Sequence, residues 1–159
     1  MKQYLHRRSL IYLALAAVLT PFTGFSIAQG FVTFEKSRLV IVTDTGRHEF
    51  IVELAISDRQ QTQGLMFRRT LPINSGMLFD YRVPTHISMW MKNTFIPLDM
   101  IFIGANGRII NITQRTIPMS EVVISSNGEA RAVLEVNGGT VDRLGIKIGD
   151  VVETPLLSE

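Results

Sequence analysis

The chain has 159 residues, with 16 lysines and arginines against 14 aspartates and glutamates, three histidines and no cysteine. The absence of cysteine excludes disulfide bonds, thiolate metal sites and a cysteine nucleophile. Three of the basic residues lie among the first eight positions, so the remaining chain has 13 basic and 14 acidic residues and no cluster of lysine or arginine. This balance disfavours nucleic acid and anionic membrane surfaces as partners.

The N-terminal segment has the order of features that is typical of a secretory signal peptide. Lys2, Arg7 and Arg8 precede an apolar run at residues 10–19, and residues 26–28 (Ser-Ile-Ala) provide the small side chains of a cleavage site. The apolar run is shorter than the roughly 20 residues that a membrane-spanning helix needs. We therefore predict a signal peptide at residues 1–28 that is cleaved, a periplasmic or secreted bacterial protein, and no membrane span in the mature chain.

Cleavage would leave 131 residues. A chain of this length suits one domain and can bury a core without disulfide bonds. We predict a linker at residues 29–37, a single globular domain at residues 38–155 and a C-terminal tail at residues 156–159.

The domain is predicted to begin with a β-hairpin and a short helix. Two β-rich runs, residues 38–44 and 47–55, are joined by a Thr-Gly pair, which favours a hairpin turn. Ser57 is followed three residues later by Gln60, which predicts a capping box at the start of a helix over residues 58–66.

Short strands dominate the rest of the predicted domain. Pro84 separates the first two of them, and Gly145 ends a single helical turn near the C-terminus. The predicted strands are residues 77–81, 86–91, 98–104, 108–115 and 131–136, followed by a closing segment at residues 146–154. The predicted fold class is mainly β, of the α+β type: a small single domain with a barrel-like arrangement of short strands and two short helices.

The stretch at residues 89–102 (MWMKNTFIPLDMIF) contains polar side chains within the most apolar part of the mature chain. Pro97 keeps the preceding residue out of helical geometry and so predicts a bend between two strands. Asp99 follows the bend, in an otherwise apolar strand where an isolated carboxylate would be costly to bury. We therefore expect it to have a partner, with Arg68, Lys92 and the backbone of the turn at residues 92–94 as the alternatives.

A series of short segments extends this pattern along the chain. The segments are Gly64-Leu65-Met66-Phe67-Arg68, Leu71-Pro72, Gly76-Met77-Leu78-Phe79, Met89-Trp90-Met91-Lys92-Asn93-Thr94, Ile96-Pro97-Leu98-Asp99-Met100-Ile101-Phe102-Ile103, Val133-Leu134-Glu135-Val136 and Gly149-Asp150. In their order the chain resembles the domain of unknown function family 192, over roughly residues 38–155. The resemblance implies a small, mostly β domain that is often exported and has no agreed substrate. It also favours Arg68 over Arg69 as the arginine that enters a site.

The first functional hypothesis is a non-enzymatic module that binds a small polar or anionic ligand. Trp90 and the methionines would provide apolar walls, two basic side chains would provide charge, and the turn would provide hydrogen bonds. The candidate ligand-binding residues are Arg68, Trp90, Lys92, Asn93, Thr94 and Asp99. No catalytic residue and no cofactor is assigned.

Two alternative functions remain open at this point. Asp99 and Glu135 could form the paired carboxylates of a carbohydrate- or envelope-directed hydrolase, although Glu135 is equally well explained as an ion-pair partner. Alternatively, the polar residues only stabilise the fold of a structural or assembly factor of the cell envelope, with no ligand.

A copper site is a weaker possibility. His86, Met89 and Met91 around Trp90 provide soft ligands and an aromatic ring of the kind that suits Cu(I). Methionine on a strand more often fills a hydrophobic core, so no metal site is predicted.

Overall fold

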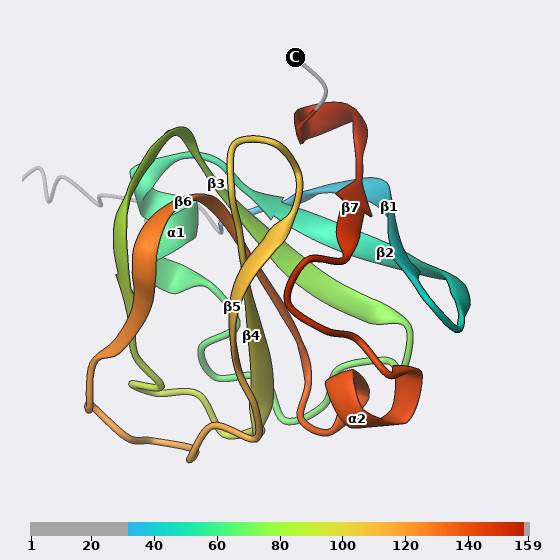
Figure 1. Cartoon of the computed structure of the whole chain (residues 1–159). Helices are drawn as coiled ribbons and strands as arrows, with labels where there is room; N and C mark the ends of the chain where they lie inside the picture. Colours follow the sequence, from blue (N-terminus) through green and yellow to red (C-terminus); the bar gives the residue numbers. More distant parts are fainter. Residues whose placement is uncertain (1–31, 158–159) are drawn as a thin grey trace, which may run out of the picture. The chain divides into compact units, whose positions relative to one another are not determined.

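The computed structural model describes residues 32–157 (Figure 1). The predicted signal peptide and its cleavage site lie outside the described residues. The described part contains β1 (Glu35–Thr43), β2 (Gly46–Ala55), α1 (Asp58–Gln63), β3 (Ser75–Met89), β4 (Leu98–Ile103), β5 (Ile109–Thr113), β6 (Ile124–Asn137), α2 (Thr140–Leu144), β7 (Val151–Glu153) and a 3-10 turn, η1 (Pro155–Leu157). None of the helices in this part is long and apolar enough to cross a membrane.

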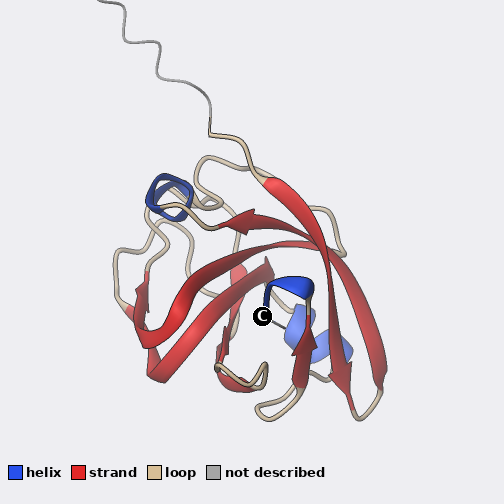
Figure 2. Cartoon of the chain, turned by 90° about the horizontal axis from the view of Figure 1, so that it is seen from above, coloured by secondary structure: helices blue, strands red, loops and turns tan. Residues whose placement is uncertain are grey.

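The seven strands form one curled sheet in the order β5-β4-β6-β3-β2-β1-β7 (Figure 2). Neighbouring strands are antiparallel, except that β2 and β3 are parallel. A parallel pair cannot be joined by a tight turn, and here α1 and the loop after it make the connection. The prediction of a small, mainly β domain with two short helices is confirmed.

The local sequence signals explain the first elements. The hairpin of β1 and β2 turns between Thr43 and Gly46, as the Thr-Gly pair predicts. The Ser57 hydroxyl accepts from the backbone N–H of Gln60, and the Gln60 side chain accepts from the backbone N–H of Ser57, so the capping box is present. α1 is shorter than predicted, because the backbone turns away at Gly64.

The strand boundaries differ from the prediction at β3 and at β6. β3 is one strand of 15 residues and includes Pro84, where a break was predicted. Two irregularities in its pairing with β6 accommodate the proline, which lies in an exposed part of the strand. β6 begins at Ile124, seven residues earlier than predicted, because it pairs with the outer part of β3.

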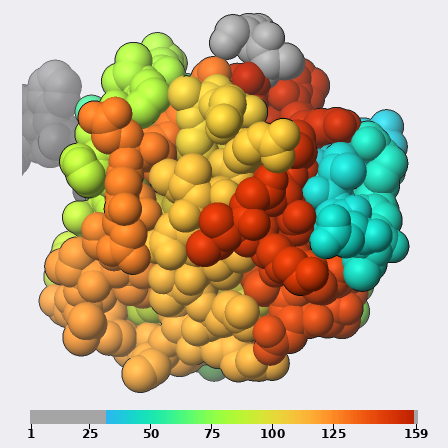
Figure 3. Space-filling view, viewed as in Figure 1, coloured from blue at the N-terminus to red at the C-terminus, as the bar shows by residue number. Residues whose placement is uncertain are grey.

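The predicted domain boundaries also need correction. β1 begins at Glu35, which pairs with Leu54, so residues 35–37 belong to the sheet rather than to a linker. At the other end, η1 spans Pro155–Leu157 and so includes two residues of the predicted tail. In Figure 3 the C-terminal segment (red) lies against the β1–β2 hairpin (cyan), as the pairing of β7 with β1 requires.

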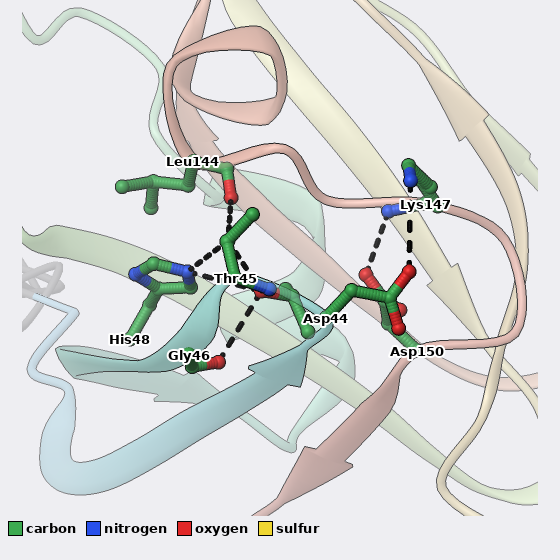
Figure 4. A network of polar contacts seen from close by, with 8 residues as sticks. Asp44, Thr45, Gly46, His48, Leu144, Lys147 and Asp150 are labelled. Atoms are coloured by element: carbon green, nitrogen blue, oxygen red, sulfur yellow. Dashed lines mark hydrogen bonds and ion pairs between the residues drawn. The ribbon is translucent and has the colours of Figure 1, made fainter.

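Polar contacts hold the tip of this hairpin to the segment after α2 (Figure 4). The Thr45 hydroxyl donates to the backbone carbonyl of Leu144 over 3.0 Å. Asp44 lies 3.6 Å from the ammonium group of Lys147, whose backbone N–H donates to the Asp150 carboxylate. These side chains are exposed, so the contacts set the position of the hairpin more than they add stability.

Two separate hydrophobic clusters fill the two faces of the sheet. We call them the first core, which includes Ile101, Leu134 and Val136, and the second core, which includes Met77 and Met100. Successive residues of one strand point to opposite faces, so β4 and β6 contribute to both cores. The candidate site lies on the face of the second core.

Candidate functional site

A cavity of about 90 Å³ lies between the segment of α1 with its following loop and the strand β3. Its walls are mixed: about half of the lining residues are polar, and the others are apolar or aromatic. The lining residues are Gln61, Thr62, Gln63, Gly64, Leu65, Met66, Phe79, Tyr81, Ser88, Met89, Trp90, Thr94 and Glu135.

Three wider hollows, of about 610, 640 and 300 Å³, lie elsewhere on the described surface. In the first, Glu153 forms an exposed ion pair with Arg47. In the second, the buried carboxylate of Asp80 lies 3.4 Å from the guanidinium group of Arg131. The other acids that line these hollows, Asp58 and Glu35, are exposed, whereas the acid in the small cavity is buried and has no partner among the described residues. We therefore place the candidate site at the small cavity.

Glu135 is the ionisable side chain of greatest interest in this cavity. It lies in β6 directly opposite Met77 of β3 and Met100 of β4, which places its side chain on the face of the second core. Only 4% of the residue is exposed. None of the described residues forms a hydrogen bond or an ion pair with its carboxyl group. Burial raises the pKa of Glu135 to about 8, so the group is mostly protonated at neutral pH.

Tyr81 and the two lining methionines form the wall around Glu135. The Tyr81 hydroxyl donates to the sulfur of Met89 over 3.6 Å, and the side-chain amide of Asn93 lies 3.9 Å from the sulfur of Met66. Burial raises the pKa of Tyr81, and the nearby carboxylate of Glu135 raises it further. The tyrosine therefore stays neutral over the range in which Glu135 titrates.

The turn at residues 92–94 positions the other wall. Asn93 has a positive φ of 54°, and its carbonyl accepts from the backbone N–H of Phe67 over 2.8 Å. The Thr94 carbonyl accepts from the backbone N–H of Met119 over 3.0 Å. These bonds hold three loops together, which fixes Trp90 and Thr94 beside the cavity.

The predicted ligand-binding residues separate into two groups. Trp90 and Thr94 line the cavity, and Asn93 contacts the lining residue Met66. Lys92 is outside the lining: its ammonium group lies 5.0 Å from the centre of the Trp90 ring and 3.8 Å from the carboxylate of Glu121. This places a cation at the half-exposed face of Trp90 rather than inside the cavity.

Arg68 has a different environment from the predicted one. Its guanidinium group forms an ion pair with Glu53 and lies 5.8 Å from the centre of the Phe34 ring. It does not line the cavity. Its charge is therefore matched within the protein.

Asp99 is fully buried and has a structural environment. Its carboxylate accepts from the backbone N–H groups of Arg115, Gly139 and Val141, over 2.8, 3.0 and 2.8 Å. The predicted partners were wrong, because the strand directs Asp99 away from the turn at residues 92–94 and towards the start of α2. The carboxylate fixes this helix and the end of β5, and it does not contact the cavity.

The paired-carboxylate hypothesis is also wrong. Asp99 lies opposite Val136, a residue of the first core, whereas the neighbouring pair of Met100 and Glu135 lies on the face of the second core. The sheet therefore separates the two carboxyl groups. They cannot act together on one glycosidic bond, which requires both groups to flank it.

The residues proposed for copper do not form a common site either. His86 has an exposed side chain, and the buried sulfur of Met91 accepts from the Thr116 hydroxyl over 3.1 Å. The described residues contain no group of three or more histidine, cysteine, aspartate or glutamate side chains that could hold a metal ion.

The sequence reasoning missed much of the cavity lining. Tyr81 and the segment at residues 61–64 carried no motif that distinguishes a site from a core or a helix. The sequence suggested Glu135 either as half of a carboxylate pair or as an ion-pair partner, and not as a site residue by itself. One signal was available in the sequence. Residues 132–136 form an otherwise apolar run, and a strand of this composition buries both faces, so a glutamate within it marks a candidate site without any partner.

Comparison with known proteins agrees with the fold. A structure from Sinorhizobium meliloti 1021, described as a candidate transcription regulator, is 44% identical, with a TM-score of 0.77 over 80% of this chain and 99% of that chain. A protein of unknown function from Novosphingobium aromaticivorans DSM 12444 is 39% identical, with a TM-score of 0.74 over 88% of this chain and 94% of that chain. No curated protein matches the chain.

The family comparison gives the same result as the resemblance of the sequence segments. The model of the family DUF192, described as "Uncharacterized ACR", matches residues 40–154. Four of the segments that carry the resemblance, around Met66, Phe79, Trp90 and Glu135, meet at the cavity. The chain belongs to the domain of unknown function family 192.

Proposed function

We propose that this protein is a non-enzymatic module of the periplasm or the cell exterior that binds a small ligand in the cavity around Glu135. One observation carries the proposal: a buried carboxyl group at the cavity has no partner among the described residues. Its oxygens are not among the described side-chain atoms that are sealed from solvent without a partner, so they are open to the cavity. A ligand in the cavity can therefore bond to them.

The composition of the lining favours a different ligand class from the small polar or anionic ligand that the sequence predicted. The lining contains Glu135 but no lysine or arginine, because Lys92 and Arg68 have partners outside it. An anionic group would meet an acidic side chain there. The ligand is therefore a neutral or cationic molecule with hydrogen-bond donors.

A role in transcription, which the description of the Sinorhizobium relative suggests, has little support in this chain. Binding to nucleic acid requires cations that are free to contact phosphates. Seven of the thirteen basic residues in the described part form ion pairs with carboxylates.

A thermal-shift screen tests the proposal. Sugars, amines, amino acids and organic acids would be added to the wild-type protein and to the variant Glu135→Gln, which keeps the shape of the side chain but cannot ionise. We expect a neutral or cationic compound to raise the melting temperature of the wild type and to lose most of this effect in the variant.

Glu129→Gln is the matched control, because Glu129 lies in the same strand with an exposed side chain. It should respond as the wild type does. A screen in which organic acids stabilise both the wild type and Glu135→Gln equally, while other compounds do nothing, would contradict the proposed cavity.

A further inference from the structure

We propose that the group bound beside Glu135 is a small primary ammonium ion, such as the end of a short alkylamine. This inference rests on the proposed function and names the class of its ligand. As the ion enters, the protonated carboxyl group releases its proton to water and the resulting carboxylate pairs with the ammonium. Charge is conserved, because one cation enters the site and one proton leaves it.

The lining has the chemistry that an ammonium ion requires. A primary ammonium has three N–H donors and no acceptor. The cavity offers the Glu135 carboxyl group as an acceptor, and the buried lining residue Thr94 adds a hydroxyl. Thr94 donates its own proton to the carbonyl of Lys92, so the lone pairs of its oxygen can still accept.

Aromatic side chains add a second attraction for a cation. Phe79, Tyr81 and Trp90 all line the cavity. Ring faces attract ammonium ions, by about 0.5–1 kcal/mol at exposed sites and about 2 kcal/mol when the ion is desolvated. The protein already uses this interaction at the outer face of Trp90, where the ammonium group of Lys92 lies.

The N–H groups of the ion decide between types of ammonium ion. Ethylammonium has three of them on a body of three non-hydrogen atoms, which suits a small cavity of about 90 Å³. Tetramethylammonium carries the same charge but lacks the N–H groups that would bond to Glu135.

The titratable and charged groups around Glu135 do not provide a cation that could take the place of the ammonium ion. Met77 and Met100 lie opposite it on the adjacent strands, and the contribution of α1 to the lining consists of uncharged side chains. Tyr81 is the other titratable residue in the lining. On the same face, Met77 separates Glu135 from Glu53, whose charge is matched by Arg68. None of these groups supplies a cation to Glu135.

The chain provides its own reporter for the test, because Trp90 is its single tryptophan. Ethylammonium chloride would be titrated into the full protein at several pH values from 6 to 9, while Trp90 fluorescence is recorded. Tetramethylammonium chloride and sodium chloride at the same ionic strength control for salt, and sodium acetate controls for an anion.

The expected result is a saturable change with ethylammonium alone, with an affinity that depends on pH. A side chain with a pKa of about 8 is ionised to about 1% at pH 6 and about 90% at pH 9, so the affinity should rise about 90-fold between these values and level off above pH 8. Ethylammonium itself stays protonated, since alkylamines titrate near pH 10.4. Glu135→Gln should lose the response, and Glu129→Gln should retain it.

Three results would overturn the inference: equal responses to ethylammonium and tetramethylammonium, an affinity that does not change with pH, or full binding by Glu135→Gln. The proposed function can survive this failure. If ethylammonium has no effect but a neutral compound changes Trp90 fluorescence in a Glu135-dependent way, the cavity binds a ligand of another class. If no compound of either kind acts through Glu135, both proposals fail.

Discussion

At the scale of single residues, the two acidic side chains in apolar strands have opposite roles. Asp99 accepts three backbone N–H groups, so its charge is stabilised within the fold. Glu135 has the same degree of burial but no such donors, and burial raises its pKa to about 8. Their sequence contexts are similar, and the difference arises from the face of the sheet on which each side chain lies.

The raised pKa of Glu135 predicts that the protein becomes less stable as the pH increases. The folded state holds this proton up to about pH 8, whereas the unfolded chain releases it near pH 4.5. The contribution is therefore fully present below pH 4.5 and is lost as the pH rises to about 8, with a total loss of about 3–5 kcal/mol in the free energy of unfolding. Urea unfolding at pH 5 and pH 8.5 measures it.

In the same experiment, Glu135→Gln should remove most of this pH dependence and should be more stable than the wild type at pH 8.5. Glu129→Gln should keep the wild-type dependence. If both variants follow the wild type at both pH values, Glu135 is not the group that titrates.

Asp99→Asn should destabilise the protein without impairing the cavity. The asparagine side chain has one oxygen in place of two, and its NH2 group would face a backbone donor, so at least one buried N–H group loses its partner. We expect a loss of about 2–3 kcal/mol in the free energy of unfolding.

Asp44→Asn is the exposed control for Asp99→Asn. Its ion pair with Lys147 is solvent-accessible, so the change should cost less than about 1 kcal/mol. Loss of ligand binding by a folded Asp99→Asn protein would contradict a purely structural role for Asp99.

At the scale of elements, sequence reasoning succeeded where the signal was local. The capping box at Ser57 and the Thr-Gly turn at Gly46 depend on neighbouring residues, and both are present. It failed at Pro84, which lies within β3, because the pairing with β6 is interrupted between Asp80 and Thr85, where no N–H group is needed, and resumes after the proline. The parallel pairing of β2 with β3 also joins segments that no local pattern links.

Gly76 shows how closely β3 and β6 approach each other beside the site. A Cβ atom at this position would lie 2.4 Å from the backbone carbonyl oxygen of Glu135, which cannot move without shifting the strand. We expect Gly76→Ala to lower the free energy of unfolding by about 1–3 kcal/mol and to weaken ligand binding, because it displaces Glu135.

Gly128→Ala is the matched glycine control, since a Cβ atom there would lie 3.9 Å from the nearest atom. Chemical denaturation of both variants measures the difference. Equal stability of the two variants would show that β6 can shift without cost.

At the scale of the whole molecule, the polar residues of the stretch at residues 89–102 serve different faces of one sheet. Trp90 and Thr94 lie at the cavity on the second core, whereas Asp99 stabilises α2 beside the first core. The sequence predicted a site near this stretch because its composition was unusual. The sequence could not predict that these polar residues lie on two faces of the sheet. The face towards which the Asp99 side chain points depends on the register of β4 against β6.

The sharing of β3 and β6 by both cores predicts that the domain unfolds as one unit. Met77 of the second core and Leu134 of the first core are both fully buried. Met77→Ala and Leu134→Ala should each lower the free energy of unfolding by about 2–5 kcal/mol. Ile148→Ala, with 64% of the isoleucine exposed, should cost less than about 1 kcal/mol.

For each variant, Trp90 fluorescence and far-UV circular dichroism should give the same midpoint in urea, because neither core can lose its strands alone. If the fluorescence midpoint of Met77→Ala falls below its circular dichroism midpoint while the two agree for Leu134→Ala, the second core and its cavity open independently of the rest of the sheet.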